Sequence, residues 1–206
     1  MCFKRFFLTV FLTFFFLFSF KNQQSLNCCV LADTSDPGSY VMEMTKNAID
    51  TLTDTSIDQS KKESKFGELF DKNFDVSSIS RFVLGKYWKQ ASLDQKKNFI
   101  KAFRNYVVKT YSTRFNEYSG EQLTLLNSEN ESNPKIFIVH TALERGDDVP
   151  ITVDWRIGKK KDRFVILDII IEGISLAITQ RSEFVSVIDQ NEGNINKLIS
   201  LLKEKS

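Results

Sequence analysis

The sequence predicts an α+β domain in which an antiparallel sheet lies between N-terminal and C-terminal helices. Apolar residues recur at spacings of three and four before residue 119 and again after residue 181, which is typical of amphipathic helices. Between residues 122 and 171 they alternate with polar residues instead, which is typical of strands. Because the strands follow one another without intervening helices, they form a meander and not a parallel α/β sheet.

The first 32 residues have the order of a secretory signal peptide. Lys4 and Arg5 precede an uncharged apolar run over residues 6–20, and small residues at Val30 and Ala32 end the segment. The run has 15 residues, fewer than the roughly 20 that span a bilayer. We therefore predict that residues 1–32 are a signal peptide cleaved after Ala32.

Cleavage leaves residues 33–206 as a single domain, which is long enough to bury a substantial core. All cysteines, Cys2, Cys28 and Cys29, lie in the leader, so the domain has no disulfide framework. Two alternatives remain for the leader. It is either an uncleaved anchor, or it is processed as a lipoprotein signal with acylation at Cys28 or Cys29.

The charge of the predicted domain excludes one class of partner. Removing the three basic residues of the leader from a total of 28 leaves 25 basic against 26 acidic residues, a net charge of −1. Nucleic-acid binding requires a clustered basic surface that displaces counterions. We expect no nucleic-acid partner.

The first two helical segments carry apolar residues on one side. We predict a turn at residues 36–38 and then a helix over Tyr40–Leu52. Residues 53–64 are polar and are interpreted as a link or a frayed helix end. A second helix then contains Phe66, Leu69, Phe70 and Phe74.

Capping residues mark the next two helices. Asp75 or Ser77 is expected to begin a third helix that ends at Gly85. Ser92 and Gln95 have the spacing of a capping box, so a long helix is predicted to begin there. Its aromatic stripe is typical of core packing and is also broad enough to line a cavity; it consists of Phe99, Phe103, Tyr106, Val107, Tyr111, Phe115 and Tyr118.

The alternating region predicts four strands, over residues 122–126, 135–144, 151–157 and 163–171. The last strand is apolar on both faces apart from Asp168. Because an antiparallel strand normally turns one face to water, either helices cover both faces or one face lines a dry cavity. Two helices close the chain, one from Ser182 and one over Ile195–Leu202.

The residues that usually carry catalysis are scarce. The domain has no thiol, one histidine (His140), and none of the nucleophile, zinc or phosphate-loop motifs. His140 is interpreted as a structural strand residue and Ser175 as a helix cap. Asp154 and Asp168 are either a carboxylate pair or ion-pair partners of the nearby cations, which are Arg156, Lys159 and Arg163. We therefore expect no enzymatic activity, no metal and no cofactor.

Four segments in order closely resemble the MlaC (toluene-tolerance) family, and the resemblance extends over about residues 40 to 202. They are FVLGKYW at 82–88, FIKAFRNYVVKTY at 99–111, VDWR at 153–156 and DIIIEGISLAI at 168–178. The resemblance implies a twisted antiparallel sheet of about four to five strands, wrapped by N- and C-terminal helices and enclosing an apolar lipid pocket.

The resemblance also implies a function. Members of this family are periplasmic carriers in Gram-negative bacteria, and phospholipid is their bound cargo. They shuttle it between an outer-membrane lipoprotein–porin complex and the substrate-binding subunit of an inner-membrane ABC transporter, which maintains the lipid asymmetry of the outer membrane. We expect a monomer, because a shuttle passes between two docking sites.

The expected pocket lining combines the apolar residues of the resembling segments with those of the strands. For each of these residues, ordinary core packing is the alternative. The expected lining is Val83, Leu84, Tyr87, Phe103, Val107, Tyr111, Val139, Trp155, Ile169, Ile171, Ile174 and Ile178. Lys86, Arg104 and Arg156 are candidate headgroup or partner contacts, with surface solvation as the alternative. The lysine-rich hairpin at 158–162 bears on headgroup or partner choice if it lies near the pocket mouth.

A carrier requires enclosed apolar surface and no reactive group. Exposing an acyl chain to water costs about 0.8 kcal/mol per methylene, so two chains of about 15 methylenes face a cost on the order of 24 kcal/mol. The alternatives are a non-lipid structural module of the cell envelope and an esterase or acyltransferase that acts on lipids. A third possibility is a carrier of a polycyclic lipid such as a hopanoid.

Overall fold

The computed structural model describes residues 36–113, 118, 120–146, 148–161 and 163–206. All of them belong to the second of the two units of the chain, Ala32–Ser206. The predicted leader and its cleavage site, and Phe115 of the aromatic stripe, lie outside the described residues. No helix in the described part is long and apolar enough to cross a membrane.

The first described helix begins earlier than predicted. Asp36 is the N-cap of α2 (Pro37–Leu52) and accepts a hydrogen bond from the Ser39 amide over 2.7 Å. The predicted turn at residues 36–38 is therefore wrong, because Pro37 occupies the first turn of the helix. Proline fits there for two reasons. Its fixed φ is helical, and an amide proton at this position would have no acceptor within the helix.

The next helices follow the predicted caps. Asp75 caps α4 (Val76–Val83) through the Ser78 amide, and Ser92 and Gln95 form both bonds of the capping box of α6 (Leu93–Ser112). The prediction that α6 continues through Tyr118 is wrong, because Thr113 is its C-cap. Two further helices complete this part, α3 (Gln59–Asn73) and the short α5 (Tyr87–Gln90).

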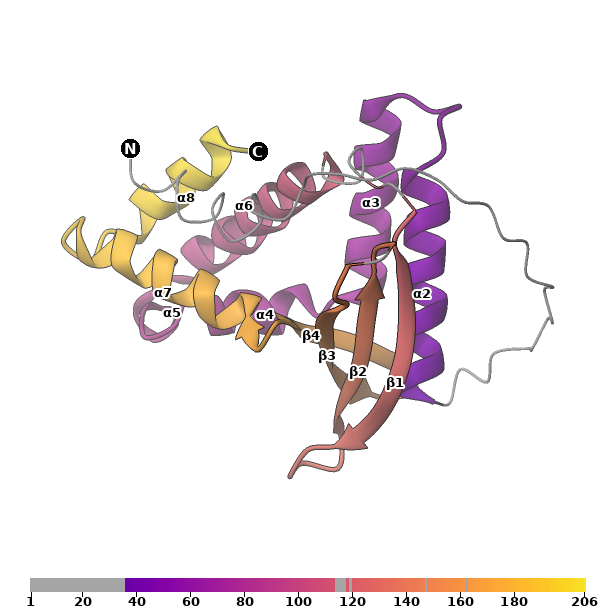
Figure 1. The fold of residues 1–206 in the computed structure, drawn as a ribbon. Helices are drawn as coiled ribbons and strands as arrows, with labels where there is room; N and C mark the ends of the chain where they lie inside the picture. Colours follow the sequence, from indigo (N-terminus) through magenta and orange to yellow (C-terminus); the bar gives the residue numbers. More distant parts are fainter. Residues whose placement is uncertain (1–35, 114–117, 119, 147, 162) are drawn as a thin grey trace. The chain divides into compact units, whose positions relative to one another are not determined.

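The fold class is confirmed. The sheet is antiparallel throughout, with the strands in sequence order from β1 to β5 (Figure 1). β5 was not predicted separately. The strands are β1 (Gln122–Asn130), β2 (Ile136–Glu144), β3 (Ile151–Lys160), β4 (Arg163–Ile171) and β5 (Ile174–Ser175).

One face of the sheet packs against α2, and the predicted alternation is confirmed in β2 and β3, whereas β1 is exposed along almost its whole length. Val139 of β2 lies opposite Trp155 of β3, and both belong to the buried cluster that contains Val41 of α2. The same face holds a buried polar pair, in which the Trp155 indole donates to the Thr141 hydroxyl over 3.1 Å. Thr141 in turn donates to the Val153 carbonyl, so neither buried polar group lacks a partner.

Two β-bulges interrupt the register. One leaves Leu126 unpaired on β1, the edge strand of the sheet, and the other leaves Leu167 unpaired on β4. A Cβ atom on Gly158 would lie 3.0 Å from the Leu167 side chain, so glycine accommodates the bulged residue. Next to this bulge, Val165 and Ile166 are both fully buried although they point to opposite faces. At this position of β4 both faces are therefore covered.

The chain closes with α7 (Leu176–Asp189) and α8 (Ile195–Glu204). α7 begins at Leu176, so the predicted start at Ser182 is wrong. Ser175 caps it through the Ile178 amide over 3.0 Å, which confirms the prediction that Ser175 is a helix cap. Asp168 also supports this start, since its carboxylate accepts a hydrogen bond from the Ala177 amide over 2.9 Å.

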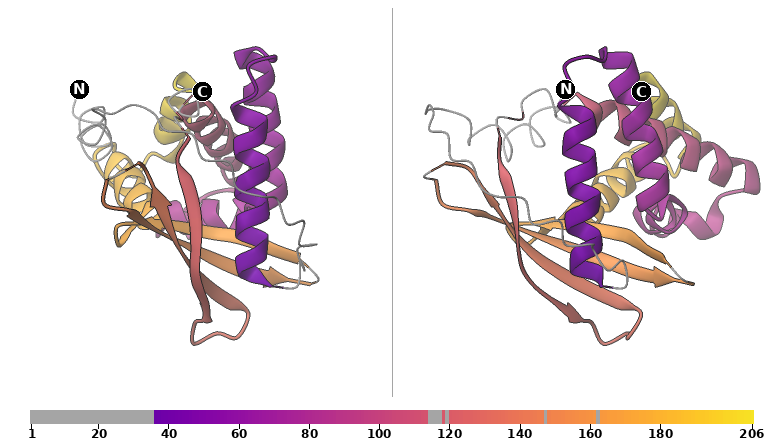
Figure 2. Two further views of the ribbon diagram at one scale, coloured as in Figure 1. Left: turned by 45° about the vertical axis from the view of Figure 1, so that its right-hand side comes forward. Right: turned by 90° about the vertical axis from the view of Figure 1, so that its right-hand side faces the viewer.

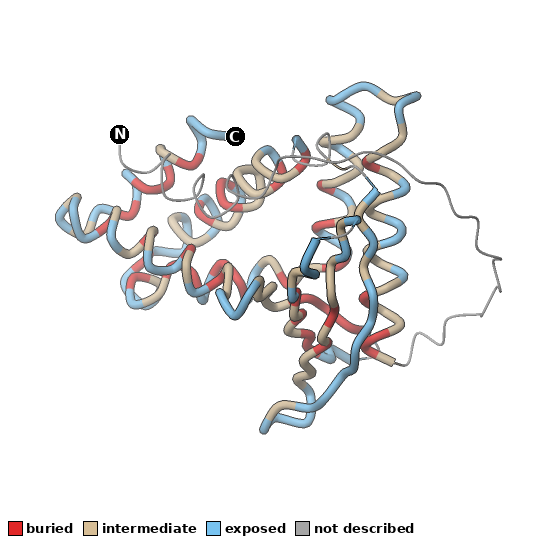
Figure 3. Tube along the Cα trace, in the orientation of Figure 1, coloured by how far each residue is buried: buried red, intermediate tan, exposed pale blue. Residues whose placement is uncertain are grey.

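The buried apolar residues form two clusters. We call the first the helical core; it joins buried residues of α4 to α8, among them Leu84, Phe99, Phe184 and Leu198. We call the second the sheet core; it joins α2 to β2, β3 and β4. Figure 3 shows the buried segments of both groups. Phe74 is half-buried and packs against both cores.

Candidate functional site

The structure distributes the expected pocket lining over both cores and the surface. Val83, Leu84, Tyr87 and Phe103 are buried in the helical core. Val139 and Trp155 are buried in the sheet core. Four positions are half-buried, namely Val107, Tyr111, Ile169 and Ile171. Ile174 and Ile178 are exposed, by 49% and 58%.

Phe74, which the sequence did not single out as a site residue, lies at the junction of the two cores. Its amide donates to the Phe70 carbonyl at the end of α3, and the two rings are 4.6 Å apart. The next amide, that of Asp75, donates to the Ile166 carbonyl of β4 over 3.0 Å, and Asp75 also caps α4. Phe74 and Asp75 therefore join the end of α3, strand β4 and the start of α4. The spacing of Phe66, Phe70 and Phe74 indicated only a helix face.

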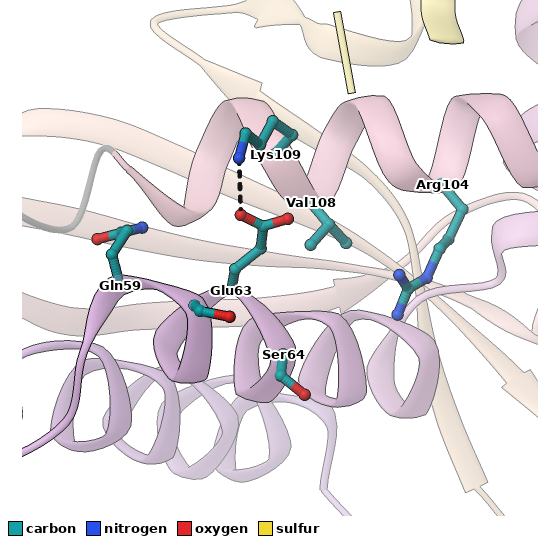
Figure 4. A pocket seen from close by; sticks show the side chains of 7 residues that line it. Gln59, Glu63, Ser64, Arg104, Val108 and Lys109 are labelled. Carbon is teal, nitrogen blue, oxygen red and sulfur yellow. Dashed lines mark hydrogen bonds and ion pairs between the residues drawn. The ribbon is translucent and has the colours of Figure 1, made fainter.

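A hollow of about 500 Å³ lies between α3 and α6 (Figure 4). Two ion pairs join the helices here, Lys109 with Glu63 at 3.1 Å and Arg104 with Asp71 at 2.8 Å. Apart from Val108, the side chains around the hollow are polar or charged, so it does not suit an acyl chain. The hollow is lined by Gln59, Ser60, Glu63, Ser64, Arg104, Val108 and Lys109.

The three candidate headgroup contacts lie on different elements and each is paired with a carboxylate. Lys86 pairs with Asp189 at 2.9 Å and Arg156 pairs with Glu131 at 2.7 Å. Arg104 pairs with Asp71 as described above, and of the three only Arg104 lines the hollow. The structure therefore does not bring these cations together into one anion site.

Arg104 depends on a glycine for its position. A Cβ atom on Gly67 of α3 would lie 2.5 Å from the Arg104 guanidinium, a distance at which one group must move. Glycine at this position lets the guanidinium lie across α3 and make two hydrogen bonds to Asp71. This requirement gives Gly67 a packing role that its unfavourable helix propensity alone would not explain.

The hydroxyl of Tyr87 links α5 to the end of α7. It donates a short hydrogen bond to Asp189, which also pairs with Lys86. These donors, first Tyr87 and then Lys86, hold the pKa of the Asp189 carboxyl below its ordinary value. Tyr87 was expected to line a pocket, but it is buried in the helical core with its polar end committed to this contact.

Glu183 of α7 is half-buried, and burial raises the pKa of its carboxyl above the ordinary 4.5. It accepts a hydrogen bond from Gln180 at 3.2 Å, with Lys205 as an opposing but weaker influence on the pKa. Burial, and secondly the charge of Glu183, also raises the pKa of Tyr106. The carboxylate therefore ionises in an environment that disfavours its charge.

We expect Glu183→Gln to stabilise the protein at pH 7. Because the folded pKa exceeds the unfolded pKa, ionisation of Glu183 destabilises the folded state progressively as pH rises above 4.5. A glutamine still accepts the Gln180 hydrogen bond without the buried charge. Urea unfolding at pH 7 and pH 4 checks this, and the gain should shrink at the lower pH. An equal gain at both pH values would contradict it.

The candidate catalytic groups have structural partners. The Ser175 hydroxyl donates to Asp168 and caps α7, and His140 contacts Asp154 at 2.8 Å and Glu129 at 3.6 Å. Asp154 and Asp168 do not pair with each other, and neither forms an ion pair with the cations proposed for it among the described residues. Among the described residues, no three His, Cys, Asp or Glu side chains are placed to hold a metal ion.

Comparison with known proteins gives consistent results. The model of the MlaC protein family matches residues 42–204. The intermembrane phospholipid transport system binding protein MlaC of Haemophilus influenzae is 26% identical over 128 residues, which are 60% of this chain and 58% of that protein. This chain thus matches less than two thirds of that relative's length.

A solved structure has the same fold. It is a phospholipid-binding protein from Ralstonia solanacearum, determined in complex with a phospholipid. The TM-score is 0.71 at 19% sequence identity, and the match covers 82% of this chain and 96% of the other. Together with the family model, which spans most of the described domain, these findings establish that the chain belongs to the MlaC protein family.

Proposed function

We propose that this protein is a periplasmic phospholipid carrier. Its role would be to move lipid between an outer-membrane lipoprotein–porin complex and the substrate-binding subunit of an inner-membrane ABC transporter. Membership of the MlaC family, a relative named for intermembrane phospholipid transport and a similar fold with a bound phospholipid support this role. The observation in the structure that carries the proposal is the division of the domain into two apolar cores that share Phe74.

Two separate cores provide a place for acyl chains. Each core has its own set of buried residues, so acyl chains between them would leave both interiors packed. The half-buried residues of the expected lining, Val107 and Tyr111 on α6 and Ile169 and Ile171 on β4, would then offer apolar surface to the lipid. Acyl chains between the cores would regain the burial that they lose on leaving the bilayer.

Such a carrier performs no chemistry on its cargo. The hydroxyl of Ser175 and the imidazole of His140 both serve neighbouring structural contacts, which favours binding over lipid hydrolysis. The predicted signal peptide supports export, and a monomer suits successive docking at two membranes. These features support a function in binding and release.

Native mass spectrometry tests the proposal. The full chain is expressed in a Gram-negative host, and the exported protein is purified from the periplasm without detergent. We expect a bound mass that is released on denaturation and identified as phospholipid. A polycyclic lipid in its place would change the cargo. An empty protein that stays empty after incubation with phospholipid vesicles would contradict the proposal and favour a structural module.

Two variants test the position of the acyl chains. Val107→Glu places a charge where a chain is expected, and Val107→Trp fills the same space without a charge, so both should lower the fraction of lipid-bound protein at least tenfold. Val149→Glu is the control, because Val149 is 81% exposed in the turn between β2 and β3. Circular dichroism confirms folding. Full lipid occupancy in the folded Val107→Trp variant would place the chains elsewhere.

A further inference from the structure

One end of the sheet carries a group of basic residues that we call the basic end. The chain contributes to it from the last turn of α3, from the turn between β1 and β2, and from the adjoining ends of β3 and β4 with the turn between them. All of its members are exposed. The basic end consists of Lys72, Lys135, Lys159, Lys160, Lys161 and Arg163.

Backbone contacts hold these three segments together. The Lys159 amide donates to the Lys135 carbonyl over 2.8 Å, which joins the two turns. The Arg163 guanidinium donates to the Lys72 carbonyl over 2.8 Å, which joins the second turn to α3. Lys160 and Arg163 face each other in the register of β3 and β4. The two turns lie at the same end of the sheet, as Figure 2 shows.

Most cations of the basic end form no ion pair with a described residue. Lys160 pairs with Asp75, but the other five cations form no ion pair with a described residue. Asp162, in the same turn, lies outside the described residues. From residue 33 onward the chain has 25 basic and 26 acidic residues, so the grouping of these six cations does not follow from the overall charge.

We propose that the basic end docks the protein onto the surface of an anionic phospholipid bilayer. The proposal rests on the proposed carrier function, which requires the protein to approach a membrane. Clusters of four to eight Lys or Arg residues bind anionic membrane surfaces through the summed potential of the headgroups. The basic end has six such residues, on three adjoining segments at one end of the sheet.

The composition of the basic end favours a bilayer over an acidic protein. Five of its six cations are lysines, whereas the centres of protein interfaces are depleted in lysine and enriched in aromatic residues, methionine and arginine. None of the exposed large apolar residues in the described part belongs to the two turns or to the last turn of α3. A diffuse array of lysine charges without apolar anchors matches a surface of mobile phosphates.

Vesicle flotation with exported protein tests the proposal. The probes are vesicles of phosphatidylethanolamine alone and of phosphatidylethanolamine mixed with phosphatidylglycerol. We expect binding to the anionic vesicles only. This binding should be lost when added salt shortens the screening length from about 30 Å at 0.01 M to about 8 Å at 0.15 M. The triple variant Lys135→Glu, Lys159→Glu, Lys161→Glu should bind at least about a hundredfold more weakly, since each cation contributes about fivefold.

The matched control is Lys97→Glu, Lys101→Glu, Lys203→Glu. It reverses three exposed lysines outside the basic end and gives the same net charge. Retained binding by this control would support a local surface. No binding by the wild type, or equal losses in both triple variants, would overturn the proposal. Unchanged vesicle binding by the basic-end variant, together with lost binding to inner-membrane proteins, would also overturn the proposal, because the partner would then be an acidic protein.

Native mass spectra of the same preparations separate this proposal from the carrier function. Phospholipid-loaded protein that ignores anionic vesicles would refute the docking surface and leave the carrier function intact. Empty protein that still binds anionic vesicles through the basic end would refute the carrier function instead. Both variants should retain their bound phospholipid, because the substituted lysines are exposed and lie outside both cores.

Discussion

Phe184→Ala is expected to lower the free energy of unfolding by about 4 kcal/mol. The side chain is fully buried in the helical core, and its ring meets two phenylalanines of α6 edge to face. The ring centroids are 5.8 Å from Phe99 and 6.0 Å from Phe103. Alanine leaves a cavity between α6 and α7 that the surrounding side chains fill only in part. It also removes two favourable aromatic contacts.

Urea unfolding followed by circular dichroism measures this loss. Phe184→Leu should cost clearly less, because it retains most of the buried volume. Phe82→Ala is the exposed control, since Phe82 is 38% exposed and its ring contacts Arg181; we expect a loss of about 1 kcal/mol or less. A similar loss for Phe82→Ala and Phe184→Ala would mean that the helical core is not organised around Phe184.

Asp168→Ala is expected to destabilise the protein by about 3 kcal/mol. One carboxylate oxygen accepts the amides of Ile169 and Ala177, both over 2.9 Å, and the other accepts the Ser175 hydroxyl. Asp168 therefore fixes the end of β4, the cap residue and the first turn of α7 at once. Alanine leaves three donors without this acceptor, and Asp168→Asn should have an intermediate effect.

Two measurements separate this network from an ordinary helix cap. Asp58→Ala removes an exposed cap with a single bond to the Lys61 amide, and it should cost only about 1 kcal/mol. A double-mutant cycle of Asp168→Ala with Ser175→Ala should give a coupling free energy of about 1 kcal/mol or more. Additive effects of the two substitutions would show that Asp168 and Ser175 act independently.

Local capping chemistry explains which elements the sequence could predict. Ser92 with Gln95, and Asp75, supply their own hydrogen bonds within three residues, so their helices begin as predicted. For α7 the sequence indicated the cap, Ser175, but placed the helix start at Ser182, because part of the support for the first turn comes from Asp168, eight residues before the helix begins. A short-range pattern cannot reveal that contact.

The candidate site was less predictable for a different reason. An apolar residue on a helix or strand has the same periodicity whether it packs in a closed core or faces a lipid. The sequence therefore grouped Leu84 with Val139, which the structure places in separate cores. It also overlooked Phe74, because its role at the junction depends on the bridge to Ile166, which is distant in the sequence.

The bulge in β1 has a consequence for how the protein behaves at high concentration. An edge strand of nine residues with free backbone groups is a template on which another chain can add a strand. The unpaired Leu126 bends this edge, and the residues after it, Asn127 to Asn130, are polar or acidic. Both features oppose edge-to-edge aggregation. For the proposed carrier function, which requires free diffusion, this edge would reduce polymerisation through the sheet.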